Sequence, residues 1–183
     1  MFGLFNKKET PEEANAKELY NIVVNVARQS VFYSDWGVPD NVDGRFDMIS
    51  VHEALLICRL EQLGDEAAEL SQQLFDQMFL DMDRSLREMG ISDLRIPKHM
   101  KRMMNGFNGR AQAYKEALLS NDNEKLHDVI KRNIYGTSDE VTDEQLHEMT
   151  AYIQKQWKYL SERTLQDFQN CENIFMKEEN NED

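Results

Sequence analysis

The stretch LFDQMFLDMDRSLREMG, residues 74–90, decides the fold class, because its apolar side chains recur every three or four positions. That spacing places them on one face of an α-helix. A glycine follows the last apolar residue, which is typical of a helix C-terminus, so we predict a helix over residues 65–89 that Gly90 caps. Its apolar stripe consists of Leu74 or Phe75, Met78, Phe79, Met82, Leu86 and Met89.

The same periodicity and its end signals predict five further helices on either side. The residues from Thr10 to Glu13 form a capping box with proline in the first turn, and those from Thr142 to Gln145 form another. Alternation of period two is nearly absent, so we predict an all-α, single-domain helical bundle of about six helices. The predicted helices cover residues 10–33, 46–63, 65–89, 97–118, 122–133 and 142–175.

The length of 183 residues suits one domain. We expect a flexible leader over residues 1–9, a helical domain over 10–175 and a disordered acidic tail over 176–183. Cys58 and Cys171 lie far apart without a CxxC motif, which favours two ordinary thiols in a reducing compartment. The sequence shows no secretory signal and no apolar run of about 18 residues, so it predicts a soluble protein or one attached to a membrane surface.

The net charge of −13 is unevenly distributed along the chain. Residues 91–138 carry +4, whereas the segments before and after carry −9 and −8. The acidic total argues against general nucleic-acid binding. Within the basic segment, Lys98, Lys101 and Arg102 recur on one helical face beside His99. This cluster predicts either a contact with phosphate, from lipid head groups or ribosomal RNA, or an ordinary solvated face.

Two Glu-x-x-His pairs, Glu124 with His127 and Glu144 with His147, suggest a metal site, because such pairs are ligands in di-iron helical bundles. In an antiparallel helical hairpin, however, the ten-residue offset between the two pairs places them roughly 15 Å apart. Ligands for two metals about 3.5–4 Å apart cannot be that distant. We therefore predict no metal and no cofactor, and keep a carboxylate–histidine metalloenzyme as the rival hypothesis.

Three other features each allow a functional and a structural interpretation. His52 lies on an apolar face and is either a general base or a buried, hydrogen-bonded histidine. Asp76 and Asp83, with Arg84 and Arg87 beside them, suit acid–base chemistry or ion pairs between helices, with Arg45 as one natural partner. The ten methionines, six of them on the third and fourth helices, either fill a core or line an adaptable apolar groove.

Several ordered blocks resemble the ubiquinol–cytochrome c chaperone family. They are residues 32–48 with His52 after them, 74–90, 97–102, 107–111 with Tyr114, and 133–136. Together they cover residues 19–136. The first residues do not resemble an Arg-rich, Ser-rich transit peptide, so we expect a bacterial member.

The resemblance implies an all-helical, non-enzymatic assembly chaperone for the cytochrome b–c complex. It implies binding of a membrane protein subunit like newly made cytochrome b, a second assembly factor, and contact with the ribosome or the membrane surface, without specific nucleic-acid recognition. We expect a cytoplasmic protein, peripheral at the inner membrane, and keep a helical adaptor without a membrane client as an alternative. The predicted partner-binding or family-signature residues are Pro39, Asp40, Asp43, Gly44, Arg45, Asp47, Asp76, Asp83, Arg84, Lys101, Arg102 and Arg110.

Overall fold

The structure is a computed structural model that describes residues 10–120, 122–138 and 140–176. The described residues form helices and no strand, which confirms the predicted all-α class. The predicted leader and the residues from 177 onward lie outside them. The elements are α1 (Pro11–Ala27), α2 (Ser30–Ser34), α3 (Val42–Gln62), the 3₁₀ turn η1 (Asp65–Ala67), α4 (Ala68–Glu88), α5 (Ile96–Ser120), α6 (Asn123–Asn133), α7 (Asp143–Ser161) and α8 (Leu165–Asn170).

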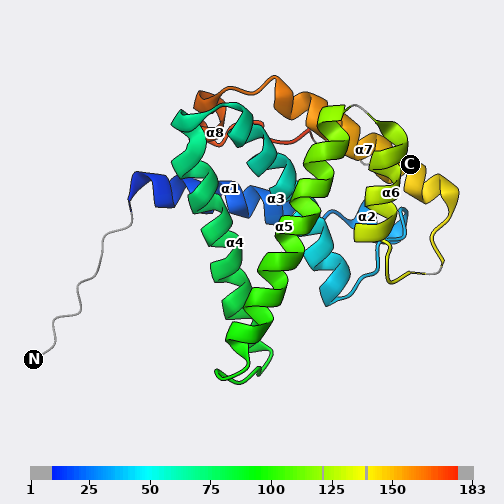
Figure 1. Ribbon diagram of the computed structural model, residues 1–183, viewed down its shortest axis with the longest axis horizontal. Helices are drawn as coiled ribbons and strands as arrows, with labels where there is room; N and C mark the ends of the chain where they lie inside the picture. The colour runs from blue at the N-terminus through cyan, green and yellow to red at the C-terminus, as the bar shows by residue number, and fades with distance from the viewer. Residues whose placement is uncertain (1–9, 121, 139, 177–183) are drawn as a thin grey trace, which may run out of the picture.

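Helix α3 is the centre of the bundle (Figure 1). It packs against α1, α4, α5 and α7, so it has neighbours on most sides. Every residue from Asp47 to Leu56 is buried, including the polar Ser50, His52 and Glu53. A helix that is buried all round cannot show a strong amphipathic stripe, which explains why its sequence pattern is the least regular of the long helices.

Side-chain caps set most helix starts where the sequence predicted them. Thr10 and Thr142 both form complete capping boxes, at α1 and α7. Helix α3 begins four residues earlier than predicted, because the Asn41 side chain accepts a hydrogen bond from the Gly44 backbone N–H at 2.9 Å and so caps the helix.

The C-terminal region differs from the single long helix that the sequence predicted. Helix α7 ends at Ser161, and Thr164 starts α8 with a third capping box. The Arg59 guanidinium donates to the Arg163 carbonyl at 2.7 Å, which ties this break to α3. After α8 the chain runs back along the bundle, and the buried Gln156 side chain exchanges two hydrogen bonds with the backbone of Met176.

Helices α4 and α5 form an antiparallel hairpin that extends beyond the other helices, with its connecting loop at the far end (Figure 1). Gly90, at a φ of 80°, ends α4 as predicted. Its N–H bonds to the Arg87 carbonyl and that of Ile91 bonds to Leu86, the paired pattern of a glycine-terminated helix. Phe75, Phe79 and Phe107 pack together where the hairpin joins the body, with centroid distances of 4.6 to 6.0 Å.

Candidate functional site

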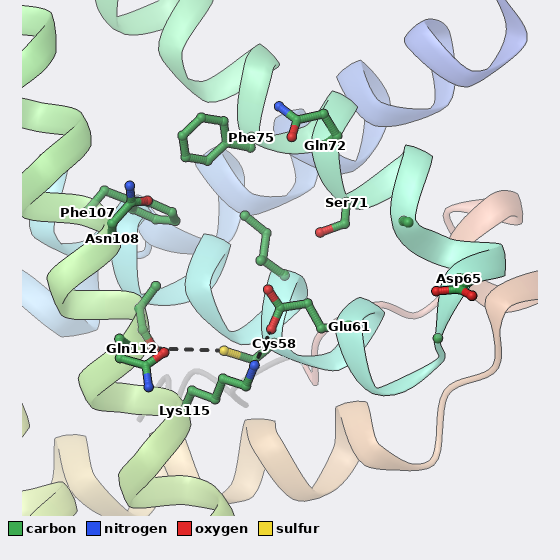
Figure 2. Close-up of a pocket in the computed structure, with 14 residues that line it drawn as sticks. Cys58, Glu61, Asp65, Ser71, Gln72, Phe75, Phe107, Asn108, Gln112 and Lys115 are labelled. Atoms are coloured by element: carbon green, nitrogen blue, oxygen red, sulfur yellow. Dashed lines mark hydrogen bonds and ion pairs between the residues drawn. The ribbon is translucent and has the colours of Figure 1, made fainter.

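A cleft of about 650 Å³ opens where the α4–α5 hairpin meets α3. Figure 2 shows side chains from all three helices directed toward it. Its apolar wall comes from Ile57 and Cys58 on α3, Phe75 on α4, and Phe107 and Ala111 on α5. A volume of this size and a wall of this composition suit one or a few apolar side chains of a ligand.

Polar groups surround the mouth of the cleft. Lys115 of α5 and Glu61 of α3 pair across it, with 2.7 Å between Nζ and Oε2. Gln72 and Asn108 add uncharged donors and acceptors from α4 and α5 (Figure 2). An apolar wall with a polar rim is the arrangement of protein-binding surfaces.

The Cys58 thiol lies at this cleft and is poorly suited to nucleophilic chemistry. Burial, with a contribution from nearby Glu61, raises the pKa of the Cys58 thiol to about 12. The thiol lies 3.9 Å from the Ala111 carbonyl oxygen. Because the thiolate is the reactive form, Cys58 remains a packing residue at neutral pH.

Asp47 and Arg110, both predicted family-signature residues, meet although 62 residues separate them in the chain. The Arg110 Nη2 atom lies 2.9 Å from Asp47 Oδ1, an ion pair without the alignment of a full hydrogen bond. The guanidinium also lies 5.6 Å from the centre of the Phe46 ring. Burial raises the pKa of Asp47 to about 7, and the charge of Arg110 offsets only part of that effect. The pair fixes α5 to α3 beside the cleft.

The predicted loop residues build the entry to α3. A Cβ on Gly44 would lie 2.0 Å from the Pro39 carbonyl oxygen, so only glycine fits. Arg45 pairs with Asp40 at 2.8 Å and not with the carboxylates of α4, because both residues flank the same turn. Asp43 is exposed in the first turn of α3, where its charge favours the helix N-terminus. These residues shape the scaffold.

The predicted residues of α4 lie mainly on its outer surface. Asp76 accepts a hydrogen bond from Gln72, and Asp83 binds Arg87 at 2.7 Å, the i,i+4 pair that the sequence predicted. Arg84 pairs with Asp81. Asp81 also accepts a hydrogen bond from the Tyr20 hydroxyl at 3.0 Å, which joins α4 to α1. Sequence reasoning missed Asp81, since nothing in its spacing distinguishes it from Asp76 and Asp83.

Lys101 and Arg102 face solvent on the outer side of α5. Neither forms an ion pair within the part of the chain that the structure describes.

The methionines of α4 and α5 divide between the two predicted roles, which were filling a core and lining an exposed apolar surface. Met78 and Met82 are buried, whereas Met89 and Met104 are exposed near the far end of the hairpin.

His52 is a buried, hydrogen-bonded histidine. Its Nδ1 atom lies 2.7 Å from the Met48 carbonyl oxygen and its Nε2 atom 2.7 Å from the Tyr152 hydroxyl. The rings of Phe32, Tyr152 and Phe175 surround it. Burial lowers the pKa of His52 to about 4, so it is neutral at physiological pH.

The two Glu-x-x-His pairs are arranged by the antiparallel packing of α6 and α7. Gln154 donates to Asn123 at 2.6 Å, which aligns the start of α6 with the second half of α7. His127 and His147 line one hollow together with Glu124, whereas Glu144 does not line it. Within residues 10–120, 122–138 and 140–176, no group of three or more His, Cys, Asp or Glu side chains is arranged to hold a metal.

Comparison with known proteins agrees with this architecture. Residues 34–174, which include α3 to α8, match the model of the family described as Ubiquinol-cytochrome C chaperone. The Ubiquinol-cytochrome c reductase complex assembly factor 1 of Mus musculus is 25% identical over 145 residues, which are 79% of this chain and 48% of that protein. The chain thus spans about half the length of this relative.

A solved structure is similar over almost the whole chain. The Cbp3 homolog from Brucella abortus has a TM-score of 0.81 and 33% sequence identity, and the match covers 95% of each chain. No helix among the described residues is both long and apolar enough to cross a membrane. The chain therefore belongs to the ubiquinol–cytochrome c chaperone family.

Proposed function

We propose that this protein is an assembly chaperone for ubiquinol–cytochrome c reductase, and that it holds an apolar segment of a newly made membrane subunit such as cytochrome b. Family membership and the name of the mouse relative support the first part. The cleft between α3, α4 and α5 carries the second part, because it combines an apolar wall with an open, polar mouth. We propose this cleft as the client site.

The environments of His52 and of the Cys58 thiol support binding without catalysis. His52 is enclosed by aromatic rings, and the Cys58 thiol is kept protonated by burial. The cleft offers an apolar wall of suitable shape, with aromatic surface from Phe75 and Phe107.

Site-specific photo-crosslinking in cells tests the client site. A photoreactive residue at Gln72 or Asn108 stands at the mouth of the cleft, and one at Gln166 on α8 is an exposed control. We expect crosslinks to cytochrome b from the two cleft positions and none from position 166. Equal crosslinking from all three would remove the cleft as the site. Normal assembly of the complex in cells that lack this protein would contradict the chaperone function itself.

A cleft-filling variant gives an independent test. Ala111→Trp places a large ring against Phe75 and Phe107, whereas Leu119→Trp adds the same ring to an exposed position of the same helix. We expect the first variant to lose recovery of cytochrome b in pull-downs and the second to retain it. Equal recovery by both variants would show that the client does not enter the cleft.

A further inference from the structure

The far end of the α4–α5 hairpin exposes apolar side chains that the fold does not use. We define the hairpin tip as residues 84–104, which cover the end of α4, the loop and the start of α5. Leu94 is 94% exposed, Met89 57% and Met104 37%. Of the six large apolar side chains that face solvent among the described residues, Met89, Leu94 and Met104 lie in the hairpin tip.

The hairpin tip also reverses the charge of the molecule. Residues 84–104 carry +4, from six basic and two acidic residues, whereas the rest of the chain carries −17. The Arg87 guanidinium binds Asp83 and, at 2.5 Å, Asp93, so the acidic group of the loop is paired with a cation. Four exposed cations form no ion pair with any described residue: Arg95, Lys98, Lys101 and Arg102.

These cations and apolar groups are arranged around one end of the hairpin. Lys98, Lys101 and Arg102 lie on the side of α5 opposite Ile96 and Phe107, which are buried. Leu94 lies in the loop, directly before Arg95. The hairpin tip therefore carries exposed apolar side chains in and beside the loop, and cations along the outer side of the first turns of α5.

We propose that the hairpin tip docks the protein onto a bilayer surface that contains anionic phospholipid. Lipid head groups attract the four cations, and the boundary between head groups and acyl chains accepts Leu94 and Met89. RNA would use the cations but has no place for exposed aliphatic side chains. Proteins usually bind single-stranded RNA by stacking its bases on aromatic side chains, and residues 84–104 contain no Phe, Tyr or Trp.

The hairpin is long enough to reduce the repulsion between an anionic membrane surface and the acidic remainder of the protein. Nine residues of α4 separate Phe79, in the aromatic cluster at the base, from Glu88 at its end, which is roughly 14 Å of helix. Charges in physiological salt are screened over about 8 Å. An anionic surface in contact with the tip therefore attracts the four cations while it repels the −17 of the remaining chain only weakly.

Vesicle co-sedimentation of the purified full chain tests this proposal. The vesicles are phosphatidylcholine alone or phosphatidylcholine with about one third phosphatidylglycerol, a composition that gives a negative surface potential. We expect binding to the anionic vesicles that weakens with salt, and little to the neutral ones. No client is present, so failure here leaves the chaperone function untouched, and failure of the client crosslinks leaves this docking untouched.

Two variants and their matched controls separate the two contributions. Lys98→Glu/Lys101→Glu/Arg102→Glu should reduce partitioning by about 100-fold or more, since each lost cation counts for roughly fivefold. The same change of net charge elsewhere, Lys131→Glu/Arg132→Glu/Lys158→Glu, should leave far more binding. Met89→Ser/Leu94→Ser should cost about tenfold, whereas Leu119→Ser should cost nothing measurable.

Leu94→Trp reports whether the tip enters the bilayer. Its fluorescence should be quenched by lipids brominated on their acyl chains, and that of Leu119→Trp should not. Equal losses in the two charge-reversed triple variants would overturn the proposal, as would unchanged binding of Met89→Ser/Leu94→Ser. Failure of the wild-type chain to bind anionic vesicles would also overturn it. If that chain instead bound RNA through Lys98, Lys101 and Arg102, the cluster would be a nucleic-acid site.

Discussion

Both ends of the α4–α5 hairpin carry apolar side chains, which are buried at the base and exposed at the tip. At the base, Phe79 and Phe107 are buried against α3, whereas at the tip Met89 and Leu94 face solvent. What differs is the partner, because α3 covers the base and no described helix reaches the tip. An apolar stripe therefore predicts a helix, but only the tertiary arrangement shows which part of the stripe is left for another molecule.

The charged groups of the two ends also differ in burial. The base keeps carboxyl groups in the interior, where Asp47 is paired with Arg110 and Glu53 is 0% exposed. The tip keeps unpaired cations in solvent. The base is thus a packed part of the core, whereas the tip is available for contact with another surface. Substitutions at the two ends should have different consequences for stability.

The largest effect is expected at the base. Phe107→Ala removes a buried ring that contacts Phe75 and Phe79, so it should lower the free energy of unfolding by about 3–5 kcal/mol. Urea denaturation followed by circular dichroism measures this. Phe107→Leu is the matched control and should cost clearly less, because it keeps most of the volume. A loss below about 1 kcal/mol for the alanine variant would mean that the base is not a packed core.

A smaller, pH-dependent effect is expected at Glu53. Neither carboxyl oxygen has a hydrogen-bond partner among the described residues, and burial raises the pKa of Glu53 well above its ordinary value. The folded state therefore binds the proton more tightly than the unfolded state. Stability from this group is fully present below the unfolded pKa, near 4.3, and is lost as pH rises toward the folded pKa.

Glu53→Gln removes this titration and keeps the shape of the side chain. We expect the variant to exceed the wild type in free energy of unfolding by roughly 1–3 kcal/mol at neutral pH, with the gap closing toward pH 4. Urea denaturation at a series of pH values measures the difference. A gap that stays constant with pH would show that Glu53 does not titrate between these limits. Glu148→Gln, at an exposed position of α7, is the control.

A local effect is expected at the end of α4, where the helix meets the loop. Arg87→Gln removes both ion pairs of Arg87 and so uncovers the charges of Asp83 and Asp93. The side chain is exposed, so the midpoint of urea unfolding should hardly change. Hydrogen exchange of the amides in the loop should accelerate, and binding to anionic vesicles should weaken. A large shift of the global midpoint would contradict the separation between base and tip.

Local rules of the sequence predicted most helix positions. The capping boxes at Thr10 and Thr142 and the C-terminal glycine of α4 are encoded within a few residues, so they could be read directly. The break after Ser161 was missed, because it depends on Arg59, a distant residue on α3, as well as on a third capping box. This prediction failed because a long-range contact interrupts what reads in the sequence as a continuous helical pattern.

The candidate site was predicted less well than the fold. Residue types and family resemblance selected Asp47 and Arg110, but the sequence could not show that they pair. The cleft depends on side chains from three helices, so no single segment shows it. The sequence could not show whether the methionine stripe fills a core or lines a groove. In the structure some of these methionines are buried and others exposed, because burial depends on how far each one lies from α3.

The smallest effect is expected at the apex of the hairpin. Leu94→Ser exchanges an apolar side chain that is 94% exposed, so the free energy of unfolding should change by less than about 0.5 kcal/mol. The same urea titration that measures Phe107→Ala measures it. A loss above about 1 kcal/mol would mean that Leu94 packs within the protein in solution, and the tip would then not be free to dock. If stability is unchanged while vesicle binding falls, the side chain serves a contact outside the protein, because the fold does not require it.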